Sequence, residues 1–156
     1  MNIILAIHPH HAEAILAGTK TAELRRVLPK NLQKGDTVFL LATGTRHIVG
    51  HCTFAGHSVC PAGGHLAAGW LSGIAGAAAV SYDFARDYLR GARTPCALLV
   101  RYPMRYAKPM HYIGSIIQSY IYTDMLPTIE HPRVENYRLY CKNHPLNTHH
   151  EQRTNR

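Results

Sequence analysis

The sequence predicts a single, mainly-β domain with two or three helices. Short apolar runs bounded by turn residues are typical of strands, and such runs occur at residues 2–7, 37–42, 46–55 and 96–100. Two other segments, residues 9–17 and 81–91, repeat apolar residues at helical spacing. With 156 residues, the chain is long enough for one domain with a substantial hydrophobic core.

The first predicted helix has signals at both ends. Pro9 fits a first helical position, where its missing N–H costs nothing. Ala12, Ile15 and Leu16 then repeat at helical spacing. Gly18 is suited to the position just after the helix, because glycine tolerates a positive φ. The helix therefore leads directly into the polar stretch that follows Gly18.

That polar stretch, residues 20–26, is the strongest candidate site. Successive side chains of a strand point to opposite faces. Thr21, Glu23 and Arg25 would therefore share one face, and the apolar residues between them the other. Lys20 falls outside this alternation, and we expect it at the loop-to-strand hinge, from which it can swing to either face. The alternative interpretation is a solvated edge strand with an ordinary Glu–Arg pair.

The arrangement Gly-x-Lys-x-x-Glu-x-Arg, from Gly18 to Arg25, resembles the signature of the ASCH domain, a family of the PUA-like superfamily. Residues 2–17, 34–40 and 82–91, with Pro103 and Lys108-Pro109, resemble the rest of the same frame. The resemblance implies a small, partly open β-barrel with peripheral helices. It also implies a role in binding RNA or a nucleotide through a basic cleft around this stretch.

The resemblance also suggests how the chain is divided. Residues 1–112 would form the barrel domain, and residues 113–142 a C-terminal extension packed on the barrel. Residues 143–156 are polar and almost without apolar anchors, which predicts a disordered tail.

Two further segments carry expectations about the fold. Residues 46–55 read as a strand with Ile48, Cys52 and Phe54 on one side, and Gly50 would provide a bend or bulge that helps to close the barrel. Residues 62–79 read as a Gly/Ala-rich loop with at most one short helix.

The helix predicted at residues 81–91 would begin at a capping Ser81 and end at Gly91. Its residues Phe84, Tyr88 and Leu89 would face inward. Tyr82, Arg86 and Arg90 would line the outer face of this helix.

The charge balance favours an anionic partner. The formal net charge is +8, and the basic excess lies in residues 1–110 rather than in a basic tail. Arg can donate a bidentate pair to a phosphate or a base edge, and Lys supplies a mobile point charge. A Pro-bounded stretch that contains Tyr102 interleaves aromatic and cationic residues, which suits base stacking with phosphate contact. The expected nucleic-acid-binding residues are Lys20, Thr21, Glu23, Arg25, Arg26, Arg46, Arg105, Tyr106 and Lys108.

Catalysis is an alternative function that the resemblance leaves open. One subgroup of the family resembles amidohydrolases that act on acetylated cytidine, with a Lys and a nucleophilic Thr from this stretch. Lys20 matches the Lys, but Glu23 stands at the Thr position and Thr21 is two residues early. The other form of this alternative is a ribonuclease, with Lys20, Glu23 and His47 or His51 as acid–base groups. A second alternative is a protein-interaction module for an acidic partner.

No metal, cofactor or membrane is expected. His8, His10 and His11 cluster, but without further ligands at metal-binding spacing they are interpreted as ordinary surface histidines. The four cysteines are far apart, without a Cys-x-x-Cys pair, and no signal peptide is evident, so we expect reduced thiols in a cytoplasmic protein. The sequence does not determine the oligomeric state.

Overall fold

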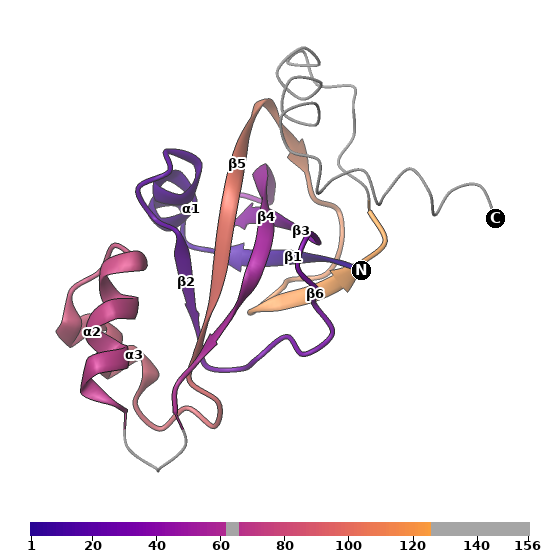
Figure 1. Ribbon diagram of the computed structural model, residues 1–156. Coiled ribbons are helices and arrows are strands. Elements are labelled where there is room, and N and C mark those ends of the chain that lie inside the picture. Colours follow the sequence, from indigo (N-terminus) through magenta and orange to yellow (C-terminus); the bar gives the residue numbers. More distant parts are fainter. Residues whose placement is uncertain (62–65, 126–156) are drawn as a thin grey trace.

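The computed structural model describes residues 1–61 and 66–125 (Figure 1). The expected tail at 143–156 and most of the expected extension at 113–142 lie outside the described residues. The elements, in chain order, are β1 (Asn2–Ile7), α1 (Pro9–Leu16), β2 (Ala22–Arg25), β3 (Thr37–Ala42), β4 (His47–Val59), α2 (Ala68–Ala77), α3 (Tyr82–Leu89), β5 (Cys96–His111) and β6 (Tyr120–Thr123).

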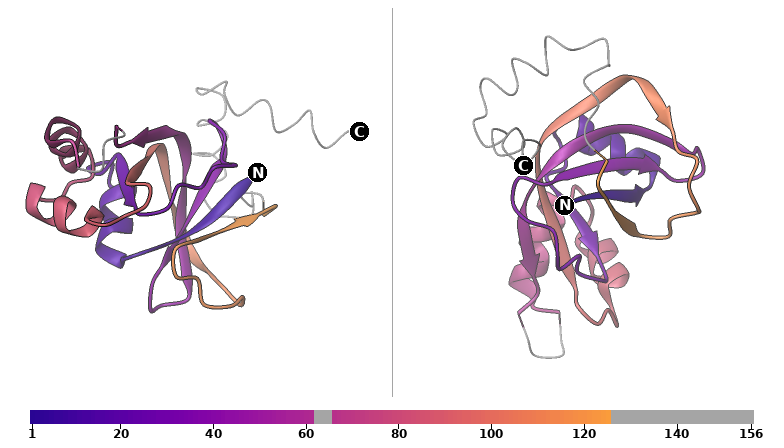
Figure 2. Two further views of the ribbon diagram at one scale, coloured as in Figure 1. Left: turned by 90° about the horizontal axis from the view of Figure 1, so that it is seen from below. Right: turned by 90° about the vertical axis from the view of Figure 1, so that its right-hand side faces the viewer.

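The strands form one mixed sheet of six strands in the order β2-β5-β4-β3-β1-β6. β1 runs parallel to β3, and every other neighbouring pair is antiparallel. The sheet curves into a half-barrel, with α2 and α3 together beside the β2 end (Figures 1 and 2). The predicted mainly-β, partly open barrel with two or three helices is confirmed, and the described residues form three.

A β-bulge at Gly50 lets the sheet bend. Leu40 pairs with Gly50 while Leu41 pairs with Ile48, so Val49 is an extra residue on β4. The predicted bulge is therefore confirmed. It also makes the simple alternation wrong, because one extra residue reverses the faces of the residues beyond it. Ile48 packs with Phe39, Leu41 and Tyr106, whereas Cys52 and Phe54 lie in a different core cluster with residues of β1 and α1.

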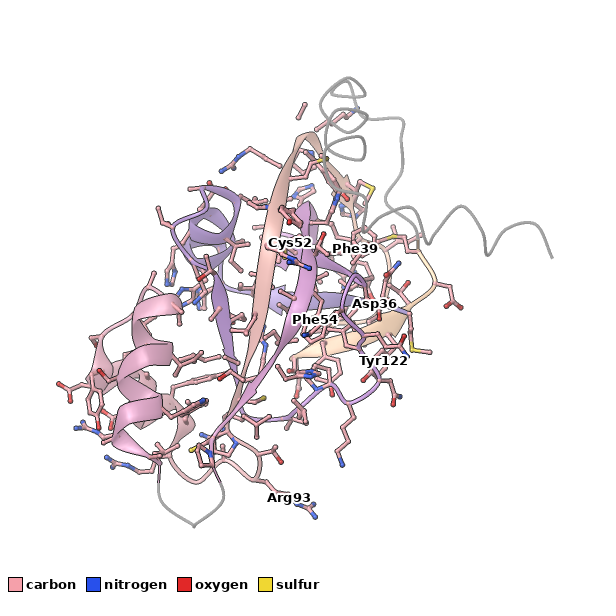
Figure 3. The ribbon with its side chains drawn as sticks, in the orientation of Figure 1. Asp36, Phe39, Cys52, Phe54, Arg93 and Tyr122 are labelled. Atoms are coloured by element: carbon pink, nitrogen blue, oxygen red, sulfur yellow. The ribbon has the colours of Figure 1, made fainter. Side chains whose placement is uncertain are left out.

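Side chains of the sheet fill the interior, and exposed cations point outward (Figure 3). Phe39, Cys52 and Phe54 are fully or almost fully buried within the sheet. Arg93, in contrast, extends away from the body at the lower edge of the view. A second apolar cluster joins α2 and α3 to β2 through residues that include Leu24, Leu71 and Leu89. The helices therefore hold β2 in place from its apolar face.

Helix α3 begins as predicted, but it is rotated from the expected orientation. The Ser81 hydroxyl accepts a hydrogen bond from the Phe84 backbone N–H at 3.1 Å, as expected for an N-cap. Ala85 and Leu89 form its buried face. The prediction that Phe84 faces inward is wrong, because Phe84 is 48% exposed. Adjacent residues of a helix point in directions about 100° apart, and in α3 it is Ala85 that faces inward.

Two general expectations bear on the described residues. No helix among residues 1–61 and 66–125 has the length and apolar character needed to cross a membrane. Cys52, Cys60 and Cys96 are free thiols, and Cys141 lies outside the described residues.

Candidate functional site

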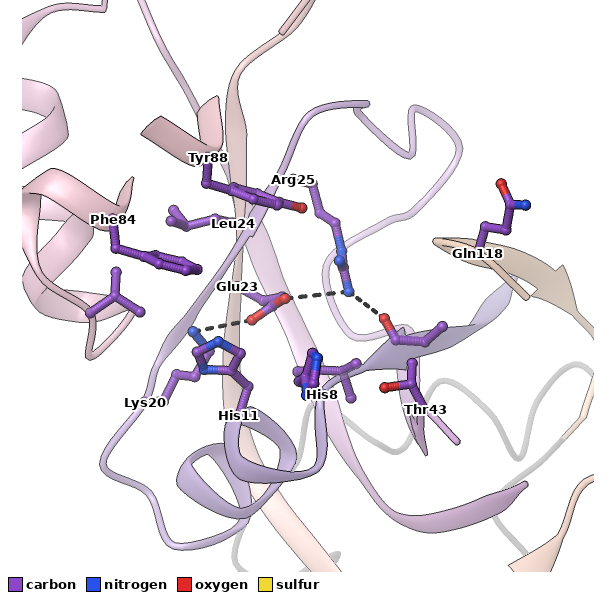
Figure 4. Close-up of a pocket in the computed structure, with 13 residues that line it drawn as sticks. His8, His11, Lys20, Glu23, Leu24, Arg25, Thr43, Phe84, Tyr88 and Gln118 are labelled. Carbon is purple, nitrogen blue, oxygen red and sulfur yellow. Dashed lines mark hydrogen bonds and ion pairs between the residues drawn. The ribbon is translucent and has the colours of Figure 1, made fainter. Parts of the chain in front are cut away.

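A pocket of about 240 Å³ opens where β2, the start of α1 and helix α3 meet (Figure 4). The pocket is lined by residues of both β1 and β2. These two strands are separated by three others in the sheet order, so the pocket lies at the open side of the half-barrel. The residues that line it are Ala6, Ile7, His8, His11, Lys20, Glu23, Leu24, Arg25, Thr43, Val80, Phe84, Tyr88 and Gln118.

A row of three charged side chains crosses the pocket. Lys20 Nζ lies 3.1 Å from Glu23 Oε2, and Arg25 Nη2 lies 3.3 Å from Glu23 Oε1 (Figure 4). Lys20, Glu23 and Arg25 are 2%, 6% and 8% exposed, respectively. Buried charges require partners, and here one carboxylate serves two cations. This is a tightly packed network rather than the solvated edge pair of the alternative interpretation.

Lys20 lies at the hinge before β2, and its side chain reaches the Glu23 face. Its Nζ also donates to the carbonyl oxygen of Ala78 at 2.6 Å, just after the last residue of α2. A cation at a helix C-terminus satisfies a free carbonyl and interacts favourably with the helix dipole. Burial lowers the pKa of Lys20, and the Glu23 carboxylate opposes that shift. Glu23 therefore stabilises the buried ammonium group together with the Ala78 carbonyl.

Arg25 spans the open side of the half-barrel. Its Nη2 donates to the carbonyl oxygen of Ala6, on β1, at 2.8 Å. The guanidinium thereby joins the edge strand β2 to β1 without a strand ladder between them. Its Nε is buried and has no hydrogen-bond partner among the described residues. The guanidinium is thus fixed at the pocket, with part of its donor capacity unused.

Two aromatic rings of α3 form one wall of the pocket. The rings of Phe84 and Tyr88 are parallel, with 3° between their planes and 6.0 Å between their centroids. The Phe84 ring also lies 6.2 Å from the ring of His11, across the pocket mouth. An exposed aromatic face beside hydrogen-bonding groups is suited to a flat, polar ligand ring.

Histidines form the opposite wall, and they are not among the site residues expected from the sequence. His8 is the N-cap residue of α1 and makes no side-chain capping bond, and His11 lies one turn later. Burial lowers the pKa of His11, and nearby Lys20 lowers it further. The sequence signal that could have revealed His8 and His11 is their position at the start of α1, directly after β1. The end of β1 lies beside β2, which carries Glu23.

Several expected site residues lie outside the pocket. Thr21 is exposed, and its hydroxyl points to the carbonyl oxygen of Ala77 at 3.5 Å. Arg26 donates to the carbonyl oxygens of Tyr88 and Arg90, which anchors the end of α3. Both residues therefore contact residues at the ends of α2 and α3 and do not line the pocket.

The remaining expected residues lie on β5 or on the turn before β4. Arg105 forms a bidentate ion pair with Glu13 on α1, at 2.6 and 2.7 Å. Arg46 donates to the carbonyl oxygen of Gly114 at 3.1 Å, and Lys108 is exposed. Tyr106 is 5% exposed, so its ring is not available for base stacking. These residues do not line the pocket.

The histidines considered for acid–base catalysis are also elsewhere. His51 is buried and shares a 2.9 Å hydrogen bond with the Tyr106 hydroxyl. His47 is exposed and contacts the ring of His111 across the β4–β5 pair. Among residues 1–61 and 66–125, no group of His, Cys, Asp and Glu is arranged to hold a metal ion.

Together, the half-barrel and its pocket define a small β protein with a buried cation–carboxylate–cation row. No protein-family model matches the sequence, and no curated protein matches it. The structure is similar to an ASCH protein from Zymomonas mobilis, with a TM-score of 0.64 and 21% identity over 89% of this chain and 93% of that chain. Two single-site variants of that protein give TM-scores of 0.64 and 0.66, at 21% and 19% identity, over 96% and 94% of their chains. The chain therefore has the ASCH fold, as the sequence resemblance implied.

Proposed function

We propose that this protein binds RNA or a nucleotide, with the ligand's base in the pocket between Glu23 and Phe84. The observation that carries the proposal is the juxtaposition of a buried, fixed charge network with an exposed aromatic face. Single-stranded nucleic acids are commonly bound by stacking on aromatic rings combined with hydrogen bonds to the base edges. The net charge of +8 adds a favourable interaction with the phosphate backbone.

The size of the pocket supports binding of a base rather than of a whole nucleotide. Sites for drug-sized ligands span roughly 300–1,000 Å³, and this pocket holds about 240 Å³. A base would enter while the sugar and phosphate remain outside. A ligand bound in this way can be one unit of a longer strand, which is why we favour RNA.

Phe84→Ala tests the proposal most directly. Base–aromatic stacking contributes about 1–3 kcal/mol per base, so we expect at least about a fivefold loss of affinity for a short single-stranded RNA of mixed sequence. Fluorescence anisotropy with a labelled RNA would measure this loss. Because Phe84 is half exposed, the variant should keep its fold, which circular dichroism would verify.

Tyr82→Ala is the matched control, because Tyr82 is a similarly exposed aromatic residue on the same helix, 41% against 48% for Phe84, and does not line the pocket. Its loss should leave RNA affinity nearly unchanged. An equal loss in both variants would point to diffuse surface binding, and unchanged binding in Phe84→Ala would refute the pocket as the site.

Amide hydrolysis by Thr21 is not supported by the position of its side chain. The Thr21 hydroxyl lies outside the pocket, and a carboxylate occupies the position that the resemblance assigns to the nucleophile. We expect no enzyme-like release of acetate from N4-acetylcytidine, measured by chromatography of the nucleoside. Release that disappears in Lys20→Ala would contradict this expectation.

A further inference from the structure

The position of the Glu23 carboxylate suggests which base the pocket takes. Each of its two oxygens has one cation beside it, Lys20 at Oε2 and Arg25 at Oε1. A carboxylate oxygen has two acceptor sites. Each oxygen therefore keeps acceptor capacity beyond this one ion pair, and the two cations fix the orientation of the group. A ligand with two adjacent N–H donors could meet both oxygens at once.

We propose that the pocket selects guanine through bidentate acceptance of its N1–H and 2-amino N–H by Glu23, with Arg25 donating to O6. This inference rests on the proposed function. An ionised carboxylate can only accept hydrogen bonds, so it binds N–H donors favourably and repels acceptor atoms that have no hydrogen. Of the four RNA bases, guanine alone presents N–H donors at two adjacent hydrogen-bonding positions of its Watson–Crick edge.

The flanking groups match the rest of the guanine ring. The carbonyl O6 lies next to N1–H, and the guanidinium of Arg25 lies next to Glu23 Oε1 at 3.3 Å. Arg25 has five N–H donors, and among the described residues its hydrogen bond and its ion pair both use Nη2, so the guanidinium retains donor capacity. The exposed ring of Phe84, parallel to that of Tyr88, provides a stacking surface for the purine. Lys20 has almost no exposed surface, and we assign it to positioning the carboxylate.

The test uses U-rich RNA heptamers that differ only in the central base, which is guanine, hypoxanthine, adenine, cytosine or uracil. Calorimetric titration of the full chain should give at least about tenfold tighter binding for guanine than for adenine, cytosine or uracil, the scale of one bidentate base contact. Hypoxanthine keeps N1–H and O6 but lacks the 2-amino group. It should therefore bind with intermediate affinity.

Glu23→Gln adds a second readout. A side-chain amide has one acceptor oxygen and one donor nitrogen, so it can accept from N1–H but not from both guanine donors. We expect the preference for guanine over hypoxanthine to disappear while hypoxanthine binding changes little. Glu13→Gln is the matched control, since Glu13 is also paired with an arginine but lies outside the pocket. It should retain the wild-type preference.

The outcomes separate the two levels of the proposal. Measurable but equal affinity for all five heptamers would overturn guanine selection and leave RNA binding in place. Tighter binding of the adenine or cytosine heptamer would also overturn it. No binding of any heptamer would overturn the proposed function itself. If Glu23→Gln does not fold, the wild-type series still decides the question.

Discussion

Glu23→Ala should lower the free energy of unfolding by about 3–5 kcal/mol, the usual cost of removing one partner from a buried ion pair. The substitution leaves both Lys20 and Arg25 buried without their shared carboxylate. It also weakens two structural links, from Lys20 to the end of α2 and from Arg25 to β1. Urea unfolding followed by circular dichroism would measure the change.

Glu13→Ala provides the control for this prediction. Glu13 forms a geometrically better ion pair, with both oxygens within 2.7 Å of Arg105. Both side chains are about half exposed, however, and exposed ion pairs contribute only about 0–1 kcal/mol. A loss in Glu23→Ala that is no larger than the loss in Glu13→Ala would mean that the buried row is not structurally important.

Gly50→Ala should also destabilise the protein, by about 1–3 kcal/mol or more, as overpacking usually does. A Cβ at this position would collide with the Met104 carbonyl oxygen, and it would lie 2.7 Å from Cδ2 of Leu16 and 3.2 Å from Cα of Arg105. Two of these neighbours are backbone atoms of β5, which cannot move without disturbing the β4–β5 pairing. Thermal unfolding would show the loss as a lower Tm.

Gly73→Ala is the matched comparison, because the same substitution should have the opposite sign there. Gly73 lies in the interior of α2, and a Cβ would meet nothing within 4 Å. Replacing an exposed helical glycine by alanine stabilises by roughly 0.5–1 kcal/mol. If both variants lost stability equally, the steric explanation at Gly50 would be wrong.

The local order of the chain was determined by its sequence. Pro9 is the first residue of α1, Gly18 follows the C-cap residue Ala17 with a positive φ, and Ser81 caps α3, each as predicted. The strands β1 and β3 follow from apolar runs at residues 2–7 and 37–42. These features depend on backbone chemistry within a few residues, which a sequence displays directly.

The sequence also identified the centre of the candidate site, but not its surroundings. Lys20, Glu23 and Arg25 come from one short stretch, so strand alternation and one hinge were enough to group them. The expectation also included residues of β5 that lie outside the pocket, where Tyr106 is buried in the core and Arg105 is paired with Glu13. Composition cannot distinguish a cationic or aromatic residue that faces a ligand from one that is used in packing.

Only the tertiary structure decided what lies opposite the charged row. His8 and His11 reach the pocket because β1 ends beside β2 across the open side of the half-barrel, and Phe84 reaches it because α3 buries Ala85 and Leu89 instead. The bulge at Gly50 similarly reverses the face of Ile48 relative to Cys52. These placements depend on contacts between residues that are far apart in the chain. They follow from how the sheet closes and how the helices pack on it, which local periodicity does not encode.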